Sequence, residues 1–276
     1  MNEMRYRKRA VSWLVQAGIG ALFGFPLYLV VVTALNSPNA IYKIPPVFIP
    51  RLDVKPLTSV LQQTHWTVYI LNTVTISVLT VLLVLVTSAF AGYALADLQF
   101  RGQNLILLFI LGTMMIPSQA ILIPQYVINA KLHLLNTYAV EIVPFAASAF
   151  GIFMFRQFFK TIPKEYWEAA TMEGGNRLFY LWRVAVPLAK PAVMTVALLT
   201  FIGSWNMFQW PLIMTDNRHI QPLEVVLAHY MTYYQGNIPK MASAVLIALV
   251  PIAVVFFIAQ RHIIAGVAGR EAGIKG

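Results

Sequence analysis

A polar, charged stretch at residues 165–187 lies between two long apolar segments of this 276-residue chain. It contains Glu-Ala-Ala at 168–170, then Gly174 after three further residues, and a Val-x-Val-Pro run that ends at Pro187. A carboxylate beside small side chains can pair with basic groups or backbone N–H donors in the groove of a partner protein. The chain has no GxxxxGK[ST] phosphate loop and no visible nucleophile–base pair. The pattern therefore predicts a protein-docking surface on a chain that is not an enzyme.

Two short helices joined by a turn are expected to position this docking surface. Residues 164–173 are good helix formers, Gly174 and Gly175 end the run, and Asn176 can cap a second helix that reaches about Ala185. We call residues 160–187 the bracket. Its predicted docking residues are Glu165, Trp167, Glu168, Ala169, Ala170, Glu173, Gly174 and Pro187, with Tyr166 and Phe179 as further aromatic anchors.

One carboxylate, Glu141, lies within an otherwise apolar segment. An ionised carboxylate at membrane depth costs about 2.5–3.5 kcal/mol on insertion scales, so its position needs an explanation. It either faces a central cavity, where it contacts solute, or sits at the outer membrane interface, solvated or paired with Lys131 or His133. The interface position is the favoured interpretation.

An aromatic and amide cluster at 205–210 also has two interpretations. Aromatic faces can stack on sugar rings while amides bond to sugar hydroxyls. Alternatively, the cluster is an aromatic belt, because Trp is enriched at membrane interfaces whatever the function. The candidate residues for a solute path or gate are Trp205, Asn206, Phe208, Gln209 and Trp210, together with Glu141. The five histidines show no metal-ligand spacing, so no metal site is expected.

Composition indicates an integral membrane protein. Hydrophobic residues make up 59% of the chain, charged residues 11%, and the mean hydropathy is +0.69. A soluble domain has about 25% charged residues. A helix needs about 20 mostly apolar residues to cross a bilayer. Six segments meet or approach that length, at about 11–35, 68–96, 104–124, 137–158, 188–212 and 241–260. We predict an all-α membrane protein with a single transmembrane domain over residues 1–276.

The distribution of Lys and Arg predicts the orientation of the spans. With the N-terminus inside, most of the 20 Lys and Arg residues fall in cytoplasmic segments, as the positive-inside rule requires. Both termini and the bracket are then cytoplasmic. The uncharged run from Ala10 is longer than the apolar part of a signal peptide, which has about 7–15 residues. We therefore expect a retained first span.

These motifs together resemble the smaller permease subunit of carbohydrate-uptake ABC importers, a group that includes maltose and glycerol-3-phosphate permeases. The resemblance covers nearly the whole chain and is carried by the bracket, Ile-Pro-Gln-Tyr at 123–126, Leu-Leu-Asn-Thr at 134–137, and Trp-Asn-x-Phe-x-Trp-Pro at 205–211. In that family the Glu-Ala-Ala segment belongs to the EAA loop, which docks into a separate ATPase subunit. Departures are Val184 and Val186, which are conservative, and Gly175, which is expected to loosen the turn.

The resemblance implies a set of partners and a location. The partners are a second, related permease subunit, two ATPase subunits and an extracytoplasmic substrate-binding protein. ATP and Mg are bound by the ATPase, so no cofactor is expected in this chain. No nucleic-acid partner is expected, and the implied location is the bacterial inner membrane.

The solute is left open by the sequence. A di- or oligosaccharide and glycerol 3-phosphate, or a related polyol phosphate, both fit the resemblance. No Arg or Lys is expected to be buried in a span, which favours a neutral sugar over a phosphate. An ion-coupled secondary transporter and a membrane-embedded enzyme are less favoured, because they would need buried ionisable residues in both halves or clustered catalytic groups.

Overall fold

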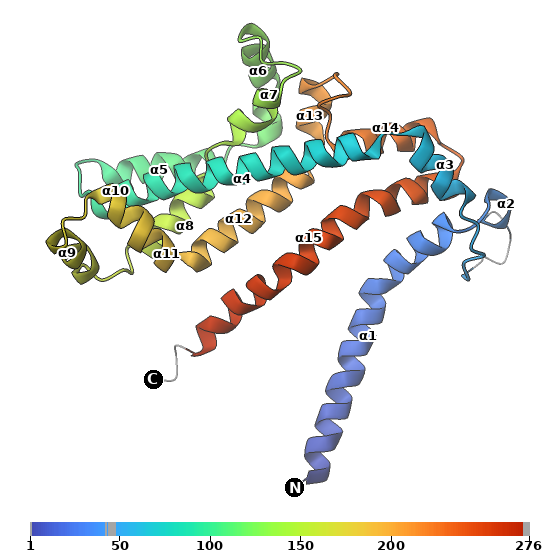
Figure 1. Ribbon diagram of the computed structural model, residues 1–276, viewed down its shortest axis with the longest axis horizontal. Coiled ribbons are helices and arrows are strands. Elements are labelled where there is room, and N and C mark those ends of the chain that lie inside the picture. The colour runs from blue at the N-terminus through green and yellow to red at the C-terminus, as the bar shows by residue number, and fades with distance from the viewer. Residues whose placement is uncertain (1, 42, 44–47, 273–276) are drawn as a thin grey trace. The chain divides into compact units, whose positions relative to one another are not determined.

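Helices form the regular secondary structure of the computed structural model, which describes residues 2–41, 43 and 48–272 (Figure 1). Three helical segments are long and apolar enough to cross a membrane: Ser12–Ala34 within α1 (Asn2–Ala34), α4 (Trp66–Asp97), and Ile238–Val255 within α15 (Ile238–Ala272). Three bent helix pairs also qualify, which gives up to six spans. The predicted all-helical membrane fold is confirmed. The predicted cytoplasmic ends include residues 1 and 273–276, which lie outside the described residues.

Proline residues mark the bends in the three pairs. The pairs, with the angle between their helices, are α5 (Gln103–Thr113) and α6 (Ser118–Lys131) at 95°, α7 (Tyr138–Ile142, followed by the 3-10 turn Val143–Phe145) and α8 (Ala149–Phe159) at 43°, and Arg177–Leu188 and α12 (Lys190–Trp205) at 81°. Pro117, Pro144 and Pro191 lie in or next to the breaks. Proline lacks a backbone donor and disfavours helical geometry in the preceding residue. The spans expected over 104–124 and 137–158 are therefore interrupted helices, whereas the bend at Ala189 lies at the start of the span expected over 188–212.

Contacts within the chain divide it into two units. The first comprises Met1–Trp66 and Val226–Val254, and the second comprises Thr67–Val225 and Val255–Gly276. The first unit contains α1, α2 (Pro38–Ile41), α3 (Lys55–Gln63), most of α14 (Leu223–Tyr233) and the beginning of α15. Its packing includes Trp66, whose ring lies 5.7 Å from that of Tyr230 and whose indole N–H donates to the Val60 carbonyl.

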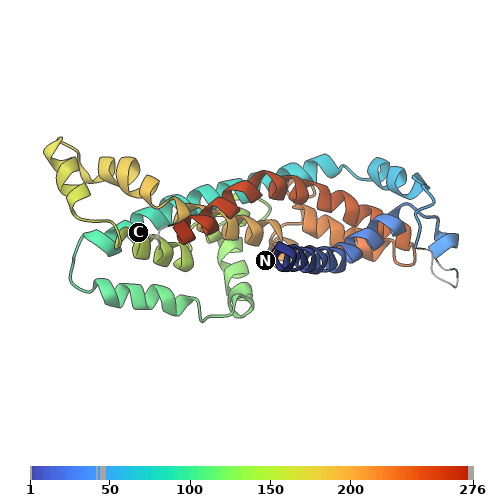
Figure 2. The same cartoon turned by 90° about the horizontal axis from the view of Figure 1, so that it is seen from below.

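The second unit is built along α4. Figures 1 and 2 show α8 and α12 running along this helix. Gly92 of α4 lies so close to α8 that an added Cβ would come within 2.6 Å of the Phe155 Cβ. Gly151 of α8 likewise leaves no room for a Cβ beside the Ser88 side chain of α4. Small residues that let helix backbones approach closely are typical of membrane-helix interfaces.

Candidate functional site

The predicted bracket is present as four short helical pieces. They are α9 (Glu165–Met172), α10 (Arg177–Tyr180), a π-helical turn (Leu181–Ala185) and α11 (Val186–Leu188). The sequence predicts one helix over 164–173 and another from Asn176 to about Ala185, and both are found. The π-helical turn comes directly before α11, which contains Pro187. Proline has no N–H to donate to the carbonyl four residues earlier, which explains the local change of helix type.

The turn between α9 and α10 is fixed by two glycines. Gly174 has a φ of +81°, in the left-handed region that favours glycine. Its N–H donates to the Thr171 carbonyl at 3.0 Å, and the Gly175 N–H donates to the Ala170 carbonyl at 2.8 Å. These two bonds form the Schellman motif, which satisfies carbonyls at the end of a helix.

Gly175 does not loosen the turn, which corrects the expectation from sequence. A Cβ at position 175 would lie 2.7 Å from the Ala170 carbonyl oxygen and 2.9 Å from Cδ1 of Phe179. The first of these atoms belongs to the backbone and cannot rotate away. Glycine is therefore required here by the close approach of the two bracket helices, and it makes the turn tight.

The second bracket helix begins with a side-chain cap and ends in a sharp bend. The Asn176 Oδ1 accepts from the Phe179 N–H at 2.8 Å, as the sequence predicts. At its other end, Arg177–Leu188 turns by 81° into α12, and Pro191 lies in the first turn of α12. The bracket thus runs across the direction of the helix that follows it.

One face of α9 is exposed along its length. Glu165, Glu168, Ala169 and Met172 occupy positions i, i+3, i+4 and i+7, which lie on the same side of an α-helix. All four side chains are exposed. The two carboxylates are near the helix N-terminus, where the helix dipole stabilises negative charge. This face combines charge, a small side chain and an apolar end.

The opposite face of α9 is turned inward, where Trp167 and Ala170 do not form the expected surface. Ala170 is buried, and Trp167 is partly buried. The Trp167 ring packs edge-on against Tyr180 at 5.3 Å, and the Arg177 guanidinium lies 5.2 Å from its centre. These two residues hold α9 to α10, so they support the exposed face of α9 from behind. Their spacing of three residues, with Gly174 beyond, indicates this inward face in retrospect.

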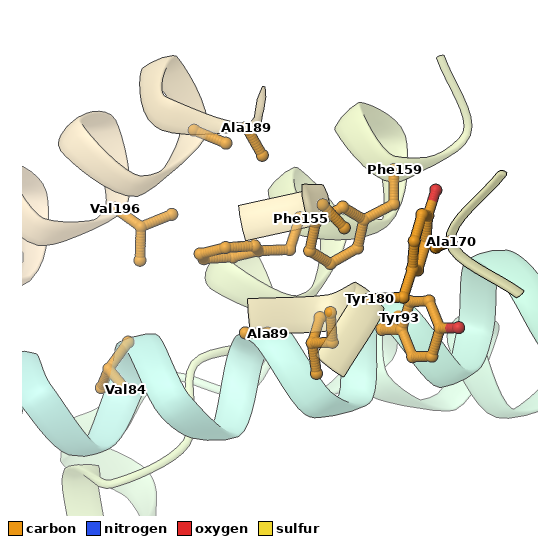
Figure 3. Close-up of a cluster of buried hydrophobic side chains, with 12 residues drawn as sticks. Val84, Ala89, Tyr93, Phe155, Phe159, Ala170, Tyr180, Ala189 and Val196 are labelled. Atoms are coloured by element: carbon orange, nitrogen blue, oxygen red, sulfur yellow. The ribbon is translucent and has the colours of Figure 1, made fainter. Parts of the chain in front are cut away.

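The bracket is anchored in the transmembrane helices by a continuous apolar cluster. Figure 3 shows Tyr180 and Ala170 of the bracket beside Tyr93 of α4 and Phe159 of α8. The Tyr93 ring lies 6.2 Å from the Phe159 ring and 6.1 Å from the Tyr180 ring. The cluster continues into α12 through Val196. The bracket, α4, α8 and α12 therefore share one cluster of closely packed side chains.

Three exposed apolar residues of the bracket, Met172, Leu178 and Trp182, have no counterpart among the sequence predictions. Met172 is 84% exposed and Leu178 is 58% exposed, compared with 49% for Tyr166 and 47% for Phe179. The i+7 relation of Met172 to Glu165 is the signal that could have identified it. Glu173, Gly174 and Pro187 are also exposed, although none of them lies on the face of α9 described above.

Glu141 is neither solvated nor paired with Lys131 or His133. Its side chain is 1% exposed, and it accepts a hydrogen bond from the Thr215 hydroxyl. Thr215 lies 74 residues further along the chain. The expected solvation or pairing is therefore wrong, because the carboxyl is enclosed by this chain's own residues.

The aromatic cluster at 205–210 is divided between buried and exposed residues. Trp205 is 2% exposed and Trp210 is 6% exposed. The Trp210 indole N–H donates to the Val140 carbonyl at 3.0 Å, and its ring meets Phe145 edge-on at 5.1 Å. Both tryptophan rings are thus covered within this chain, so neither the sugar-stacking nor the belt interpretation describes them. The exposed members of the cluster are Asn206, Phe208 and Gln209.

A buried cation, Arg156, contradicts the expectation that no Arg or Lys is buried in a span. It is 6% exposed and lies in α8. Its Nε donates to the Leu95 carbonyl at 3.1 Å, and its Nη2 donates to Oδ1 of Asn104 at 3.2 Å. The Gln103 side chain donates to the same Leu95 carbonyl. Arg156 therefore connects the end of α4 to α5 and α8.

The described residues show no metal-binding geometry. Across residues 2–41, 43 and 48–272, His, Asp and Glu form no group of three or more that could hold a metal ion. The candidate site consists of an exposed face on α9 that is supported from behind by the aromatic residues Trp167 and Tyr180.

Comparison with known proteins identifies the family. Residues 85–269 match the family described as the inner membrane component of binding-protein-dependent transport systems. The chain belongs to this family. It is a multi-pass inner-membrane protein and a permease component of the ABC importer type, as its resemblance predicts.

Individual relatives agree with this assignment. The chain is 34% identical over 212 residues to the arabinooligosaccharide transport permease AraQ of Halalkalibacterium halodurans, covering 77% of this chain and 75% of AraQ. It is 27% identical over 258 residues to the sn-glycerol-3-phosphate transport permease UgpE of Yersinia pestis, covering 90% and 91%. A solved structure, a bacterial ABC transporter involved in import of the acidic polysaccharide alginate, matches with a TM-score of 0.78 and 26% identity. That match covers 92% of this chain and 96% of the other.

Proposed function

We propose that this permease imports an oligosaccharide delivered by an extracytoplasmic binding protein, and that a separate ATPase subunit drives it through the exposed face of α9. The observation that carries the docking proposal is the division of α9 into two faces. Glu165, Glu168, Ala169 and Met172 are exposed, while Trp167 and Ala170 fix the helix from behind. An exposed face on an anchored helix suits a docking surface that must transmit force.

The mechanism follows from how the bracket is held. Closure of the ATPase dimer on ATP supplies a difference in affinity between two conformations of the permease. The bracket passes this difference to α4, α8 and α12 through Tyr93, Phe159 and Tyr180. The outward-open state accepts solute from the binding protein, and ATP hydrolysis restores the inward-facing state.

The proposed solute is a di- or oligosaccharide because AraQ, at 34% identity, is named for arabinooligosaccharides. The second candidate is glycerol 3-phosphate, which is favoured by the longer match to UgpE. The expected lack of buried basic residues no longer argues for a neutral solute. However, the Nε and Nη2 groups of Arg156 donate to the Leu95 carbonyl and to Asn104. These bonds favour a structural role for this cation.

The second permease subunit is proposed from the surface of α5. No residue of α5 is buried, and Leu105, Leu108 and Phe109 are 56%, 65% and 69% exposed. Such an apolar helix requires lipid or another membrane protein around it. A related permease is the partner that the family resemblance implies.

The docking proposal is tested by purifying the chain from its native membrane and identifying what accompanies it. Wild type is expected to retain an ATPase and a second permease. Glu168→Ala and Ala169→Asp are expected to weaken ATPase recovery, while Asp53→Asn, a change outside the bracket, leaves it unchanged. Equal ATPase recovery from all four proteins would refute docking on α9.

The solute is tested separately by uptake into proteoliposomes that contain the purified importer. Labelled arabinose oligosaccharides and labelled glycerol 3-phosphate are compared, with the co-purified binding protein and ATP present. ATP-dependent uptake of the oligosaccharide alone supports the primary proposal. Uptake of glycerol 3-phosphate alone supports the second candidate, and ATP-independent uptake contradicts both.

A further inference from the structure

The segment at 215–222, between α13 (Gln209–Met214) and α14, is joined to other parts of the second unit by several long-range hydrogen bonds. We call this segment the strap. Its partners lie on α4, on α7, and in the turn that leads into α7. Figure 1 shows α13, from which the strap begins, close to α7. Each attachment includes hydrogen bonds between residues at least 66 positions apart in the sequence.

The first attachment is made by Asn136. Its Oδ1 accepts from the backbone N–H groups of Asp216 at 2.7 Å and Asn217 at 3.0 Å. Its own N–H donates to the Met214 carbonyl at 3.1 Å. Asn136 has a φ of +59°, a conformation that asparagine tolerates better than most residues. Asn136 therefore holds both the last residue of α13 and the first part of the strap.

The second attachment joins α7 to the strap. Glu141 accepts from the Thr215 hydroxyl, and both side chains are at most 1% exposed. The Thr215 carbonyl in turn accepts from the Gln221 side chain at 2.9 Å. The indole bond from Trp210 to the Val140 carbonyl is close to this attachment in sequence, since Val140 precedes Glu141 and Trp210 lies five residues before Thr215.

The third attachment joins α4 to the end of the strap. The Asn72 Nδ2 donates to the carbonyls of His219 at 2.9 Å and Gln221 at 3.0 Å. Its Oδ1 accepts from the Tyr138 hydroxyl at 2.6 Å, which brings α7 into the same network. Thr73 accepts from the Leu223 N–H at 2.8 Å.

These bonds make opening of the strap costly as a whole. Asn72, Glu141, Thr215 and Gln221 are all buried. A buried polar group that loses its hydrogen-bond partner is strongly unfavourable, because it keeps the full desolvation penalty. Separating the strap from either α4 or α7 would strand several such groups together. The strap and the helix ends that it joins therefore favour moving together over moving apart.

The network lies at the opposite end of α4 from the bracket. Asn72 is near the beginning of α4, and Tyr93, which contacts the bracket, is near its end. At 1.5 Å per residue the two are about 30 Å apart, comparable to the hydrocarbon thickness of a bilayer. If α4 moves as one rigid helix, a displacement at Tyr93 also moves the end of α4 to which the strap is attached.

We infer that the strap keeps the far ends of α4, α7 and α13 together as one body throughout the transport cycle, and that Asn136 and Glu141 are positioning residues for this purpose. The inference rests on the proposed function as an ATP-driven permease. Glu141 acts through Thr215 and does not contact solute. The strap then converts movement of α4 at the bracket into coordinated movement at the opposite membrane face.

The first test measures uptake per ATP hydrolysed in proteoliposomes, for importers with equal recovery of the ATPase. Glu141→Leu removes the acceptor for Thr215 and is expected to lower this ratio about tenfold. Glu141→Gln keeps a carbonyl acceptor and is expected to stay within about twofold of wild type. A merely structural role would lower ATP hydrolysis and uptake equally, leaving the ratio unchanged. An unchanged ratio in Glu141→Leu, or an equal loss in Glu141→Gln, would overturn the inference.

The second test replaces the Asn136 bonds with a covalent link. The chain has no cysteine, so Asn136→Cys with Asp216→Cys introduces the only two thiols. The double variant is expected to show a low ratio of uptake to ATP hydrolysis before treatment, and recovery once a short bis-methanethiosulfonate reagent joins the two thiols. Reduction should reverse the recovery, and Asn136→Cys alone should not respond. Arrest by the link would show that the strap must open, and no recovery would also contradict the inference.

These outcomes are separate from a failure of the proposed function. If wild type retains no ATPase, or takes up solute without ATP, the proposed function fails before any strap variant is compared. If wild type couples ATP hydrolysis to uptake and the strap variants behave like it, only the inference about the strap fails.

Discussion

Gly175→Ala gives a quantitative test of how the bracket is built. An alanine Cβ would lie 2.7 Å from the Ala170 carbonyl oxygen, where ordinary van der Waals contact begins at 3.4 Å. The two groups must therefore separate by about 0.7 Å, the difference between these distances. The same carbonyl accepts the Gly175 N–H at 2.8 Å, so the relaxed bond lengthens to about 3.5 Å and is largely lost.

The expected cost combines overpacking and the weakened hydrogen bond. Overpacking costs about 1–3 kcal/mol, and a hydrogen bond contributes about 0.5–1.5 kcal/mol. We take about 2 kcal/mol for the free energy of opening the bracket, since part of the strain is relieved when the bond is lost. This corresponds to roughly 30-fold faster hydrogen exchange by local opening.

Hydrogen–deuterium exchange of the purified importer measures this change. The amides of α10, including Phe179 and Tyr180, should exchange about 30-fold faster in Gly175→Ala, while those around Ala89 in α4 should not change. Gly174→Asn serves as the matched control, because nothing lies within 4 Å of that position and asparagine tolerates positive φ. Wild-type exchange in Gly175→Ala, or an equal increase in the control, would refute the steric argument.

Three further predictions concern other parts of the chain. Gly92→Leu would press on Phe155 at the crossing of α4 and α8, and we expect the detergent-solubilised protein to melt several degrees lower, at about 2–4 °C per kcal/mol; an unchanged melting temperature would contradict this. Trp210→Phe loses the bond to the Val140 carbonyl but keeps an aromatic ring, so a loss of about 1 kcal/mol is expected by thermal denaturation, smaller than for Trp210→Ala. Burial raises the pKa of Glu224, which lies outside the candidate spans. The folded state then holds the proton more tightly than the unfolded state. The free energy of unfolding therefore falls as the pH rises from the ordinary pKa of a glutamate to the raised pKa of Glu224 in the folded state. Glu224→Gln should be more stable than wild type at neutral pH and less dependent on pH in that window, and identical pH profiles would count against the assignment.

Local signals in the sequence were sufficient to predict the bracket. The Asn176 cap, the two glycines after α9 and the proline at 187 each act on the backbone within four residues of themselves. Helix caps and turns depend on such short-range bonds, which explains why their positions agree with the prediction. The apolar runs likewise determine the membrane class, because bilayer thickness sets the length of a span.

The bends within the spans were less accessible to sequence reasoning. Pro117, Pro144 and Pro191 are visible in the sequence, yet proline is tolerated inside membrane helices when neighbours satisfy the freed backbone groups. Proline inside α1, at Pro26, accordingly does not end that helix. Whether a proline bends, breaks or only interrupts a span depends on what packs around it.

The sequence by itself determined that this is a helical membrane protein of the permease type with a helix–turn–helix bracket, since apolar run lengths, caps and charge placement act locally or against the bilayer. Only the tertiary structure decided which faces of these elements are used. Ala170 faces inward because Tyr180 and the transmembrane helices cover it, and Gly175 is required because Ala170 approaches it. Glu141 and Trp210 were assigned to the interface or a solute path, but their partners lie 74 and 70 residues away. Pairings over such distances depend on how the helices pack, which residue spacing in one sequence does not specify.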